Sequence, residues 1–229
     1  MKALILCGGL GTRLRSVIGA TQKAVADIDG QPFINLVAEE LAAAGINDLV
    51  FCTYYQSDQI EKAVAALSPN HLRRTCLVLE STPLGTGGAI VHAISQLAYI
   101  GPFIALNADT YLDASAYRAA AAAPSPVLLV TPMPDCTRYG AVVVDKNNRV
   151  LKVTEKGIAG PGLISAGVYG LHTSLLREFP VGPLSMEQDI VPTLIAQEKL
   201  TATLYSGPFL DIGTPESLSY IREHGVQKL

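Results

Sequence analysis

The sequence predicts an α/β fold, a three-layer sandwich with a mixed, mostly parallel central sheet and a small β extension. Short apolar runs alternate with helical patterns through residues 1–131, which is typical of strand–helix units around a parallel sheet. After Pro132 strand-like segments follow one another with turn-rich stretches between them, which indicates a mixed extension of the sheet. With 229 residues, of which 49% are hydrophobic, the chain can bury a full core. We therefore expect one domain, residues 1–229.

Strands of the first half are expected where short apolar or β-branched runs occur, because both faces of a strand in such a sheet are buried. These runs are Ala3–Cys7, Leu49–Tyr54, Thr75–Leu79, Phe103–Leu106 and Val127–Thr131. Helical patterns lie between them, at Phe33–Ala44, Gln59–Leu67, Gly88–Leu97 and the alanine-rich Ser115–Ala123. Ligands of parallel sheets bind at the carboxyl ends of the strands, so the loops after these runs are the expected place for a site.

The sequence predicts short strands and two helices in the second half, residues 132–229. Strand-like segments are Ala141–Val144, Val150–Thr154, Ile164–Leu171, Leu200–Tyr205 and Phe209–Asp211. A helical pattern covers Met186–Gln197. A last helix is expected to begin at Pro215, because Thr214 can cap it and proline suits the first helical position.

Composition excludes several classes of partner. The chain has 17 Lys and Arg against 20 Asp and Glu, and no basic cluster, whereas a nucleic-acid surface needs a concentrated basic patch. The first apolar run is too short for a signal peptide or a membrane span, so no membrane partner is expected. Four scattered cysteines without a CxxC pair argue against zinc and against a disulfide framework, and they suit a cytoplasmic location. The oligomeric state stays open between a monomer and a homo-oligomer.

A glycine-rich loop, Cys7-Gly8-Gly9-Leu10-Gly11-Thr12-Arg13-Leu14, follows the first strand. Glycines there let backbone N–H groups turn toward phosphate oxygens. Arg13 and Lys23 beside such a loop suit a triphosphate, which Arg grips with a planar fork and Lys neutralises as a point charge. The loop lacks the Gly-Lys-Ser/Thr of a Walker loop, and Leu14 stands at the third glycine of the dinucleotide motif. The alternative interpretation is a tight turn beside two solvated cations.

A second glycine cluster, Pro83-Leu84-Gly85-Thr86-Gly87-Gly88-Ala89, opens a helical pattern after the third strand. Free N–H groups at a helix start attract anions, so the cluster is expected to present a second set of free amides at the same sheet edge. Glycine would also let a nucleotide base lie against the backbone, while Glu80 or main-chain groups read its edge. The alternative is a glycine-rich helix entry without a ligand.

Two aspartates end apolar strands. Asp109 follows Phe103–Leu106 with Asn107 and Ala108 between, and Asp211 ends Phe209–Asp211. Two carboxylates, phosphate oxygens and water make a typical Mg²⁺ site, because this ion takes only one or two protein carboxylates. Taken singly, either aspartate is as well explained as a turn or cap residue.

In this order the segments resemble the sugar-1-phosphate nucleotidyltransferases, or nucleotide-sugar pyrophosphorylases, over nearly the whole chain. Leu6–Leu14 looks like the signature loop of that family, and Lys23 stands at the place of its signature lysine. Asp109 and Asp211 look like its metal aspartates. Within the family the combination is most similar to the D-glycero-α-D-manno-heptose 1-phosphate guanylyltransferases. The resemblance implies the Rossmann-like nucleotide-diphospho-sugar transferase fold, with a nucleotide-binding half at 1–131 and a sugar-binding half at 132–229.

The resemblance also implies a site. Catalytic roles fall on Arg13, Lys23 and Asp109, and Mg²⁺ would be held by Asp109 and Asp211. Nucleotide contacts are expected from Leu6, Gly8, Gly9, Gly11, Thr12, Glu80, Gly85, Thr86 and Gly87. Sugar contacts are expected from Asn107, Gly140, Glu155, Lys156, Ser165 and Gly167. The expected partners are a nucleoside triphosphate and a sugar 1-phosphate, which react to a nucleotide sugar and pyrophosphate.

Three positions depart from the family pattern. Gln22-Lys23-Ala24 replaces the usual Pro-Lys-Pro, so the loop around Lys23 is expected to be less rigid. Ala108 replaces a glycine before the metal aspartate, and its methyl group is expected to crowd that turn. Ser165 replaces an Asn that commonly contacts sugar hydroxyls, which leaves the identity of the sugar open.

Other functions stay open from the sequence. The nucleotide could be UTP, dTTP or CTP in place of GTP, and the sugar mannose, glucose or an N-acetylhexosamine. A non-catalytic nucleotide-sensing domain is a second alternative, since folds can lose their chemistry. A nicotinamide or flavin oxidoreductase is a third, but it lacks the third glycine and leaves Arg13, Lys23 and Asp211 without a role.

Overall fold

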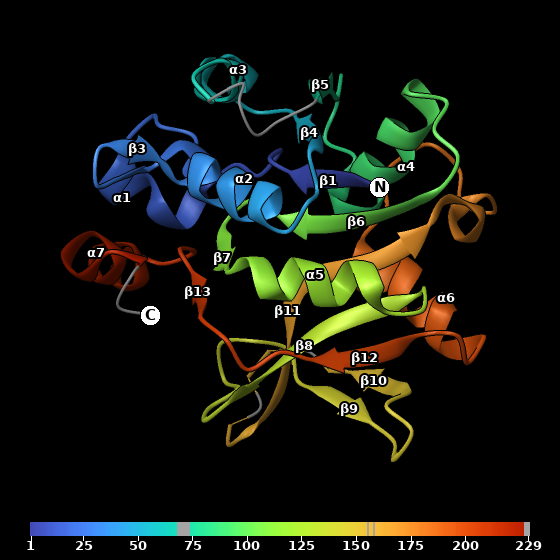
Figure 1. Ribbon diagram of the computed structural model, residues 1–229. Helices are drawn as coiled ribbons and strands as arrows, with labels where there is room; N and C mark the ends of the chain where they lie inside the picture. Colours follow the sequence, from blue (N-terminus) through green and yellow to red (C-terminus); the bar gives the residue numbers. More distant parts are fainter. Residues whose placement is uncertain (68–73, 155, 158, 227–229) are drawn as a thin grey trace.

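The computed structural model describes residues 1–67, 74–154, 156–157 and 159–226. Within them lies a seven-stranded sheet in the order β12-β8-β11-β6-β1-β4-β5 (Figure 1). Strand β11 runs antiparallel to its neighbours β6 and β8, and the other pairs are parallel. The predicted mixed, mostly parallel sheet is therefore confirmed. The strands are β1 (Lys2–Leu6), β4 (Asp48–Thr53), β5 (Arg74–Leu79), β6 (Pro102–Asn107), β8 (Val127–Met133), β11 (Gly162–His172) and β12 (Thr201–Leu204).

Helices cover both faces of this sheet, which explains the continuous apolar runs. Along β1, Ala3 and Ile5 pack on one face and Leu4 on the other, and all three are buried. The first face carries α2 (Phe33–Ala43), α3 (Ser57–Ala65), α5 (Ala114–Ala122) and α7 (Pro215–His224). The second carries α4 (Gly85–Gln96) and α6 (Val191–Ala196). Truncating a core ring such as Phe51 to alanine would cost about 3–5 kcal/mol of unfolding free energy.

Smaller strands flank the sheet. The predicted β extension is the antiparallel hairpin of β9 (Val142–Val144) and β10 (Val150–Val153), at the bottom of Figure 1. Strand β7 (Thr110–Leu112) pairs antiparallel with β13 (Phe209–Asp211), so that Thr110 lies opposite Asp211. Strand β7 and the two-residue strands β2 (Asp27–Ile28) and β3 (Gln31–Pro32) were not expected from the sequence.

Several helices differ from their predicted bounds. Helix α4 begins at Gly85, three residues before the expected start, because the second glycine cluster is itself helical. The predicted helix Met186–Gln197 is a π-helical turn, Met186–Ile190, followed by α6. Pro192, in the first turn of α6, has no N–H to donate backward, which separates the two parts. The remaining helical segments are Thr12–Leu14, α1 (Arg15–Ile18), Lys23–Val25 and Thr173–Leu176.

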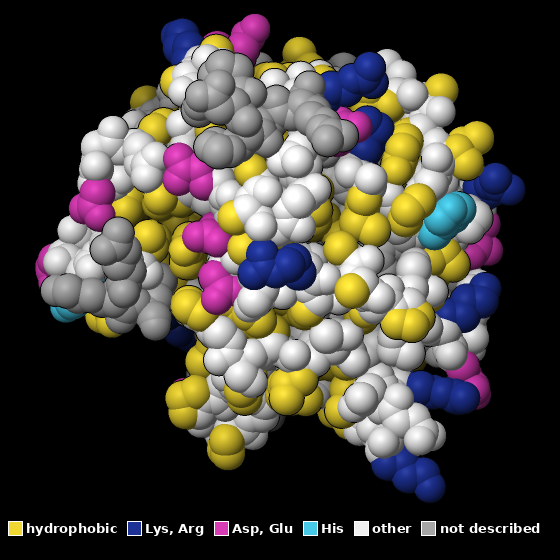
Figure 2. All heavy atoms as spheres, in the orientation of Figure 1, with side chains coloured by type: hydrophobic (Ala, Val, Ile, Leu, Met, Phe, Trp, Pro, Cys, Tyr) yellow, Lys and Arg dark blue, Asp and Glu magenta, His cyan; other side chains and the backbone are white. Residues whose placement is uncertain are grey.

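The surface is mixed in character. Lys and Arg side chains are scattered over the face seen in Figure 2, among polar, acidic and apolar ones. None of the helices in the described part of the chain combines the length and the apolar character needed to cross a bilayer.

Candidate active site

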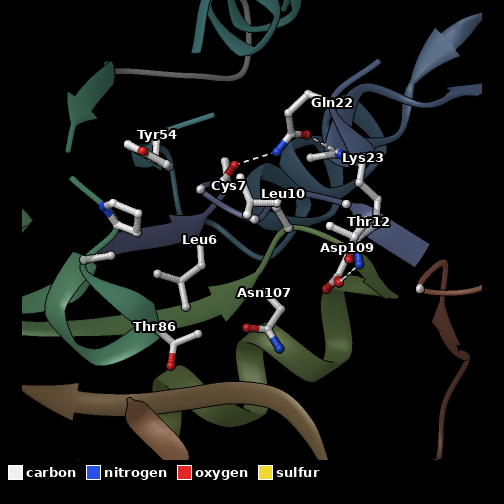
Figure 3. A pocket seen from close by; sticks show the side chains of 18 of the residues that line it. Leu6, Cys7, Leu10, Thr12, Gln22, Lys23, Tyr54, Thr86, Asn107 and Asp109 are labelled. Atoms are coloured by element: carbon white, nitrogen blue, oxygen red, sulfur yellow. Dashed lines mark hydrogen bonds and ion pairs between the residues drawn. The ribbon is translucent and has the colours of Figure 1, made fainter. Parts of the chain in front are cut away.

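The first glycine loop bounds a cavity of about 430 Å³ at the carboxyl end of β1 (Figure 3). Its entry is fixed because Cys7 N–H donates to the Cys52 carbonyl at 2.8 Å, which extends the β1–β4 pairing by one residue. Gly11 has φ of 59°, a left-handed conformation that glycine adopts without strain, and its carbonyl accepts from Leu14 N–H at 3.0 Å. The predicted residues that line this cavity are Leu6, Gly8, Gly9, Gly11, Thr12, Arg13, Lys23, Glu80, Gly85, Thr86, Asn107 and Asp109.

The two aspartates predicted to bind metal lie together beside Lys23. The Ile212 N–H donates to the Asp109 carbonyl at 3.0 Å, which joins the chain after β6 to the end of β13. Lys23 Nζ forms an ion pair with Asp109 Oδ2, and Figure 3 shows the two side chains meeting. Burial, and then the neighbouring Asp109 charge, raise the pKa of the Asp211 carboxyl, although Lys23 and the Gly213 N–H partly oppose the shift. Two carboxylates that repel each other in this way are stabilised by a nearby positive charge, which Lys23 supplies in part.

The donor set of this pair suits Mg²⁺. Among the described residues, no group of three or more His, Cys, Asp or Glu side chains is arranged to hold a metal. Mg²⁺ does not need one, because it keeps several waters and takes one or two carboxylates together with substrate phosphates. Asp109 and Asp211 are therefore the residues that could hold it.

A second cavity, of about 860 Å³, also has Asp109 in its wall. Gly167, on β11, has φ of 72°, and a Cβ there would lie 2.9 Å from Asn107 Nδ2, so the strand and Asn107 can approach only with glycine at this position. Ser165 Oγ accepts from Gly167 N–H at 3.1 Å. The predicted sugar-side residues Asn107, Gly140, Lys156, Ser165 and Gly167 all line this cavity, and so does Asp211. Glu155 lies outside the described residues.

The two cavities share part of their walls. Arg13, Asn107 and Asp109 line both. A ligand that fills the glycine-loop cavity and a ligand that fills the β11 cavity would therefore meet at these three side chains.

The prediction of free amides in the second glycine cluster is wrong for Gly87 and Gly88. Gly87 and Gly88 N–H groups both donate to the Leu184 carbonyl, at 2.9 and 3.0 Å. A Cβ at Gly88 would lie 2.2 Å from the Gly182 carbonyl oxygen, and one at Gly85 would lie 2.6 Å from that of Leu184. These glycines therefore let segment 182–186 pack against the start of α4. Gly85 and Thr86 still face the first cavity, whereas Gly87 does not line it.

Glu80 is a buried carboxylate in the wall of the first cavity. It is 6% exposed, and its Oε2 accepts from Leu84 N–H at 2.9 Å. Burial raises the pKa of Glu80, while the Leu84 hydrogen bond and the nearby His92 act in the opposite direction. The sequence predicted this residue as a contact to the nucleotide, and the structure places it between the glycine loop and α4.

Glu187 and Gln188, which the sequence did not single out, line the second cavity. They belong to the π-helical turn, and Ser185 Oγ accepts from both of their N–H groups. The Thr86 hydroxyl donates to Glu187 Oε2 at 3.1 Å and accepts from Met186 N–H at 2.8 Å, so this turn is tied to α4. The signal in the sequence was the three consecutive polar residues Glu187, Gln188 and Asp189 at the start of the predicted helix.

The departures from the family pattern are accommodated. Ala108 is 3% exposed and packs in the core, while its N–H donates to the Leu6 carbonyl at 3.2 Å. Where the sequence predicts a less rigid loop around Lys23, the turn Lys23–Val25 is capped by the Gln22 side chain, which also donates to the Cys7 carbonyl. These hydrogen bonds hold the turn at a place where the family pattern has prolines.

Comparison with known proteins agrees with this geometry. The chain matches the family described as Nucleotidyl transferase over residues 2–227. It is 31% identical to the D-glycero-alpha-D-manno-heptose 1-phosphate guanylyltransferase of Campylobacter jejuni, over 94% of this chain and 96% of that protein. It is 32% identical to the mannose-1-phosphate guanyltransferase of Emericella nidulans, of which it spans 62%.

Solved structures extend the likeness to the fold. HddC from Yersinia pseudotuberculosis, crystallised with GMP-PN, has a TM-score of 0.82 and 32% identity, covering 97% of this chain and 98% of that one. The predicted transferase fold is therefore confirmed. By its sequence match and its fold, this chain belongs to the nucleotidyl transferase family.

Proposed function

We propose that this protein transfers a guanylyl group from GTP to D-glycero-α-D-manno-heptose 1-phosphate, giving GDP-heptose and pyrophosphate. The observation that carries the proposal is the pair of cavities that share Arg13, Asn107 and Asp109. A phosphate oxygen of the sugar substrate forms a bond to the α-phosphorus, and the bond between that phosphorus and the leaving pyrophosphate oxygen breaks. The attacking phosphate is already an anion, so the protein needs to supply position and charge neutralisation.

Cations and backbone amides serve the nucleotide. The glycine loop lies against the triphosphate, where Arg13 neutralises the leaving pyrophosphate. Lys23, fixed beside Asp109, neutralises the transferring phosphate. Mg²⁺ held by Asp109 and Asp211 would supply Lewis-acid charge stabilisation and a template for the two phosphates.

Glu80 supports guanine as the base. A carboxylate accepts hydrogen bonds only, and the Watson–Crick edge of guanine offers two neighbouring donors, N1–H and the 2-amino group. Oε2 of Glu80 holds Leu84 N–H, while Oε1 lies 3.1 Å from where a Cβ of Gly8 would stand, next to the glycine loop. The uracil and thymine edges each present a single N–H there, and the cytosine edge presents an acceptor beside its amino group, so a buried carboxylate favours guanine.

The second cavity suits a polyol. Lys156, Ser165 and Glu187 bring a cation, a hydroxyl and a carboxylate to its walls. Residues 1–131 thus contribute the nucleotide side and 132–229 most of the sugar side. The related heptose enzyme favours a heptose, and the related mannose enzyme makes mannose 1-phosphate the main competitor. Four free cysteines support a reaction in the reducing cytoplasm.

The test measures pyrophosphate release with Mg²⁺ from GTP, CTP, UTP, dTTP and ATP, each with heptose, mannose, glucose and N-acetylhexosamine 1-phosphates. GTP with the heptose 1-phosphate should give the highest kcat/KM. Asp109→Asn should lower kcat by about a thousandfold, on the order of 4 kcal/mol, because it removes a metal ligand and the partner of Lys23. The matched control is Asp58→Asn, on the exposed face of α3, which should keep the wild-type rate. Turnover of mannose 1-phosphate alone would reassign the sugar, and nucleotide binding without any turnover would favour a sensor.

A further inference from the structure

Gln22 joins two segments of the site with a single side chain. Its Nε2 donates to the Cys7 carbonyl at 2.5 Å, at the entry to the glycine loop. Its Oε1 accepts from Ala24 N–H at 2.5 Å, inside the turn that carries Lys23. Figure 3 shows the Gln22 side chain spanning from Cys7 to the segment beside Lys23. The two backbone groups, at positions 7 and 24, are 17 residues apart in sequence. The side-chain amide of Gln22 is therefore a cross-link between separate segments.

Burial makes these two hydrogen bonds costly to lose. Gln22 is 3% exposed, Cys7 1% and Ala24 2%, so water cannot readily replace the amide at either end. Leaving one buried backbone group without a partner costs about 1–3 kcal/mol. A side chain that satisfies both ends therefore holds the two segments in one arrangement.

The cross-link lies next to the ion pair of Lys23 with Asp109. Lys23 directly follows Gln22, and its carbonyl accepts from Ala26 N–H at 3.1 Å, which closes the turn around it. A Cβ at Gly11 would lie 3.5 Å from Lys23 Cβ, so the glycine loop passes close to the stem of Lys23, with no room for more than a methyl group between them. Displacement of the turn would move Lys23 relative to both the loop and Asp109.

We propose that Gln22 is a positioning residue, which fixes Lys23 relative to the glycine loop and thereby sets the rate of nucleotidyl transfer. This inference rests on the proposed function. Both ends of the amide are needed, because the Cys7 carbonyl requires a donor and the Ala24 N–H requires an acceptor. Glutamate keeps only the acceptor, and it turns an oxygen toward the Cys7 carbonyl.

The test compares Gln22→Met, which keeps the volume and loses both hydrogen bonds, with Gln22→Glu, which keeps one. Misplacing a group by about 1 Å can cost a hundredfold in rate. We therefore expect kcat to fall by about ten- to a hundredfold in Gln22→Met and by about tenfold in Gln22→Glu, with the KM for GTP within about threefold of wild type. The control is Gln59→Met, which loses the 2.8 Å bond that Gln59 Oε1 accepts from Gln22 N–H and the 3.2 Å bond that Gln59 Nε2 donates to the Ala20 carbonyl, but keeps both bonds of the Gln22 side chain. It should keep kcat within about twofold.

A double-mutant cycle separates this role from a structural one. If Gln22 acts through Lys23, then Gln22→Met should change kcat by less than about twofold in a Lys23→Ala background, because coupled residues are not additive. An equal fall in both backgrounds would overturn the proposal, as would a lower melting temperature with unchanged kcat, or a higher KM for GTP alone.

Hydrogen exchange gives a readout that does not depend on turnover. The Ala24 N–H of Gln22→Met should exchange at least about tenfold faster than in wild type, whereas Gln59→Met should leave it unchanged. If wild type turns over none of the substrate pairs, the proposed function fails, yet faster exchange would still establish the cross-link. If the exchange rate of Ala24 N–H in Gln22→Met equalled that of wild type, Gln22 would not act as a cross-link, whatever the measured activity.

Discussion

Two glycine clusters, Gly8–Gly11 and Gly85–Gly88, lie at the same edge of the sheet, but their surroundings differ. In the first, a Cβ at Gly9 would meet no atom within 4 Å, so the backbone faces open space in the cavity. In the second, a Cβ at Gly88 would collide with the Gly182 carbonyl at 2.2 Å, and the N–H groups of Gly87 and Gly88 are held by Leu184. Glycine leaves the backbone open to the cavity in one place and allows close chain packing in the other.

The largest expected effect is the loss of protein stability on substitution in the second cluster. In Gly88→Ala the new methyl group must displace either α4 or residues 182–184, which should cost about 3 kcal/mol of unfolding free energy. For a chain of this size the melting temperature should fall by about 6–12 °C, measured by calorimetry. If the variant melted like wild type but bound GTP poorly, the second cluster would serve the ligand after all.

The counterpart is Gly9→Ala, which should leave the melting temperature within about 2 °C of wild type, because its methyl group meets no protein atom. The same methyl group would stand in the path of the phosphates. We expect GTP to bind about tenfold more weakly, a loss of about 1.4 kcal/mol, in isothermal titration calorimetry. If Gly9→Ala bound GTP with the affinity of wild type, the phosphates of GTP would not lie against Gly9.

A smaller effect sharpens the role of the second cluster. Thr86→Val keeps the shape but removes the hydroxyl that holds Met186 N–H and Glu187. Because Glu187 lines the second cavity, the KM for the sugar 1-phosphate should rise by about threefold, on the order of 0.7 kcal/mol, and this rise should exceed any rise in the KM for GTP. A rise confined to the KM for GTP would contradict the link between α4 and the sugar side.

The smallest effect concerns the pH dependence of stability beside the first loop. Burial raises the pKa of Glu80, so the folded state holds this proton at pH values where the unfolded chain has lost it. Stability of the ligand-free protein should therefore fall as pH rises from about 4.3 through the raised pKa. Glu80→Gln has no carboxyl group at this position, so its stability should lack this decrease with pH. The melting temperature of Glu80→Gln minus that of wild type should therefore increase as pH increases. A constant difference across pH would mean that Glu80 ionises as it does in the unfolded chain.

The sequence predicts the sheet well because its signal is local. Runs such as Ala3–Cys7 are apolar on both faces, and only a strand buried between two helical layers needs that pattern. Local pattern places each of Asp109 and Asp211 near a strand end, but their pairing is expected from the resemblance to the sugar-1-phosphate nucleotidyltransferases, because a strand end alone does not show which other strand end lies beside it. Strand β7, with three residues, is too short to give a pattern of its own.

Contacts between distant segments could not be predicted from local sequence patterns. The glycines at 85, 87 and 88 look the same whether a phosphate or the chain at 182–186 approaches them. The role of Gln22 depends on a carbonyl at Cys7, which no local pattern around position 22 reveals. Glu187 was assigned to a regular helix, and the π-helical turn that presents it to the cavity depends on the packing of Thr86 and α4.

The hydrogen bond from Ile212 N–H to the Asp109 carbonyl joins two segments that are distant in sequence. Asp109 and Asp211 therefore come together only through the pairing of β13 with β7, whereas Lys23 reaches Asp109 without β13. A local opening that detached β13 alone would remove Asp211 from the site and leave the ion pair of Lys23 with Asp109 in place. Such an opening would separate the two carboxylates without unfolding the seven-stranded sheet, because β13 is not one of its strands.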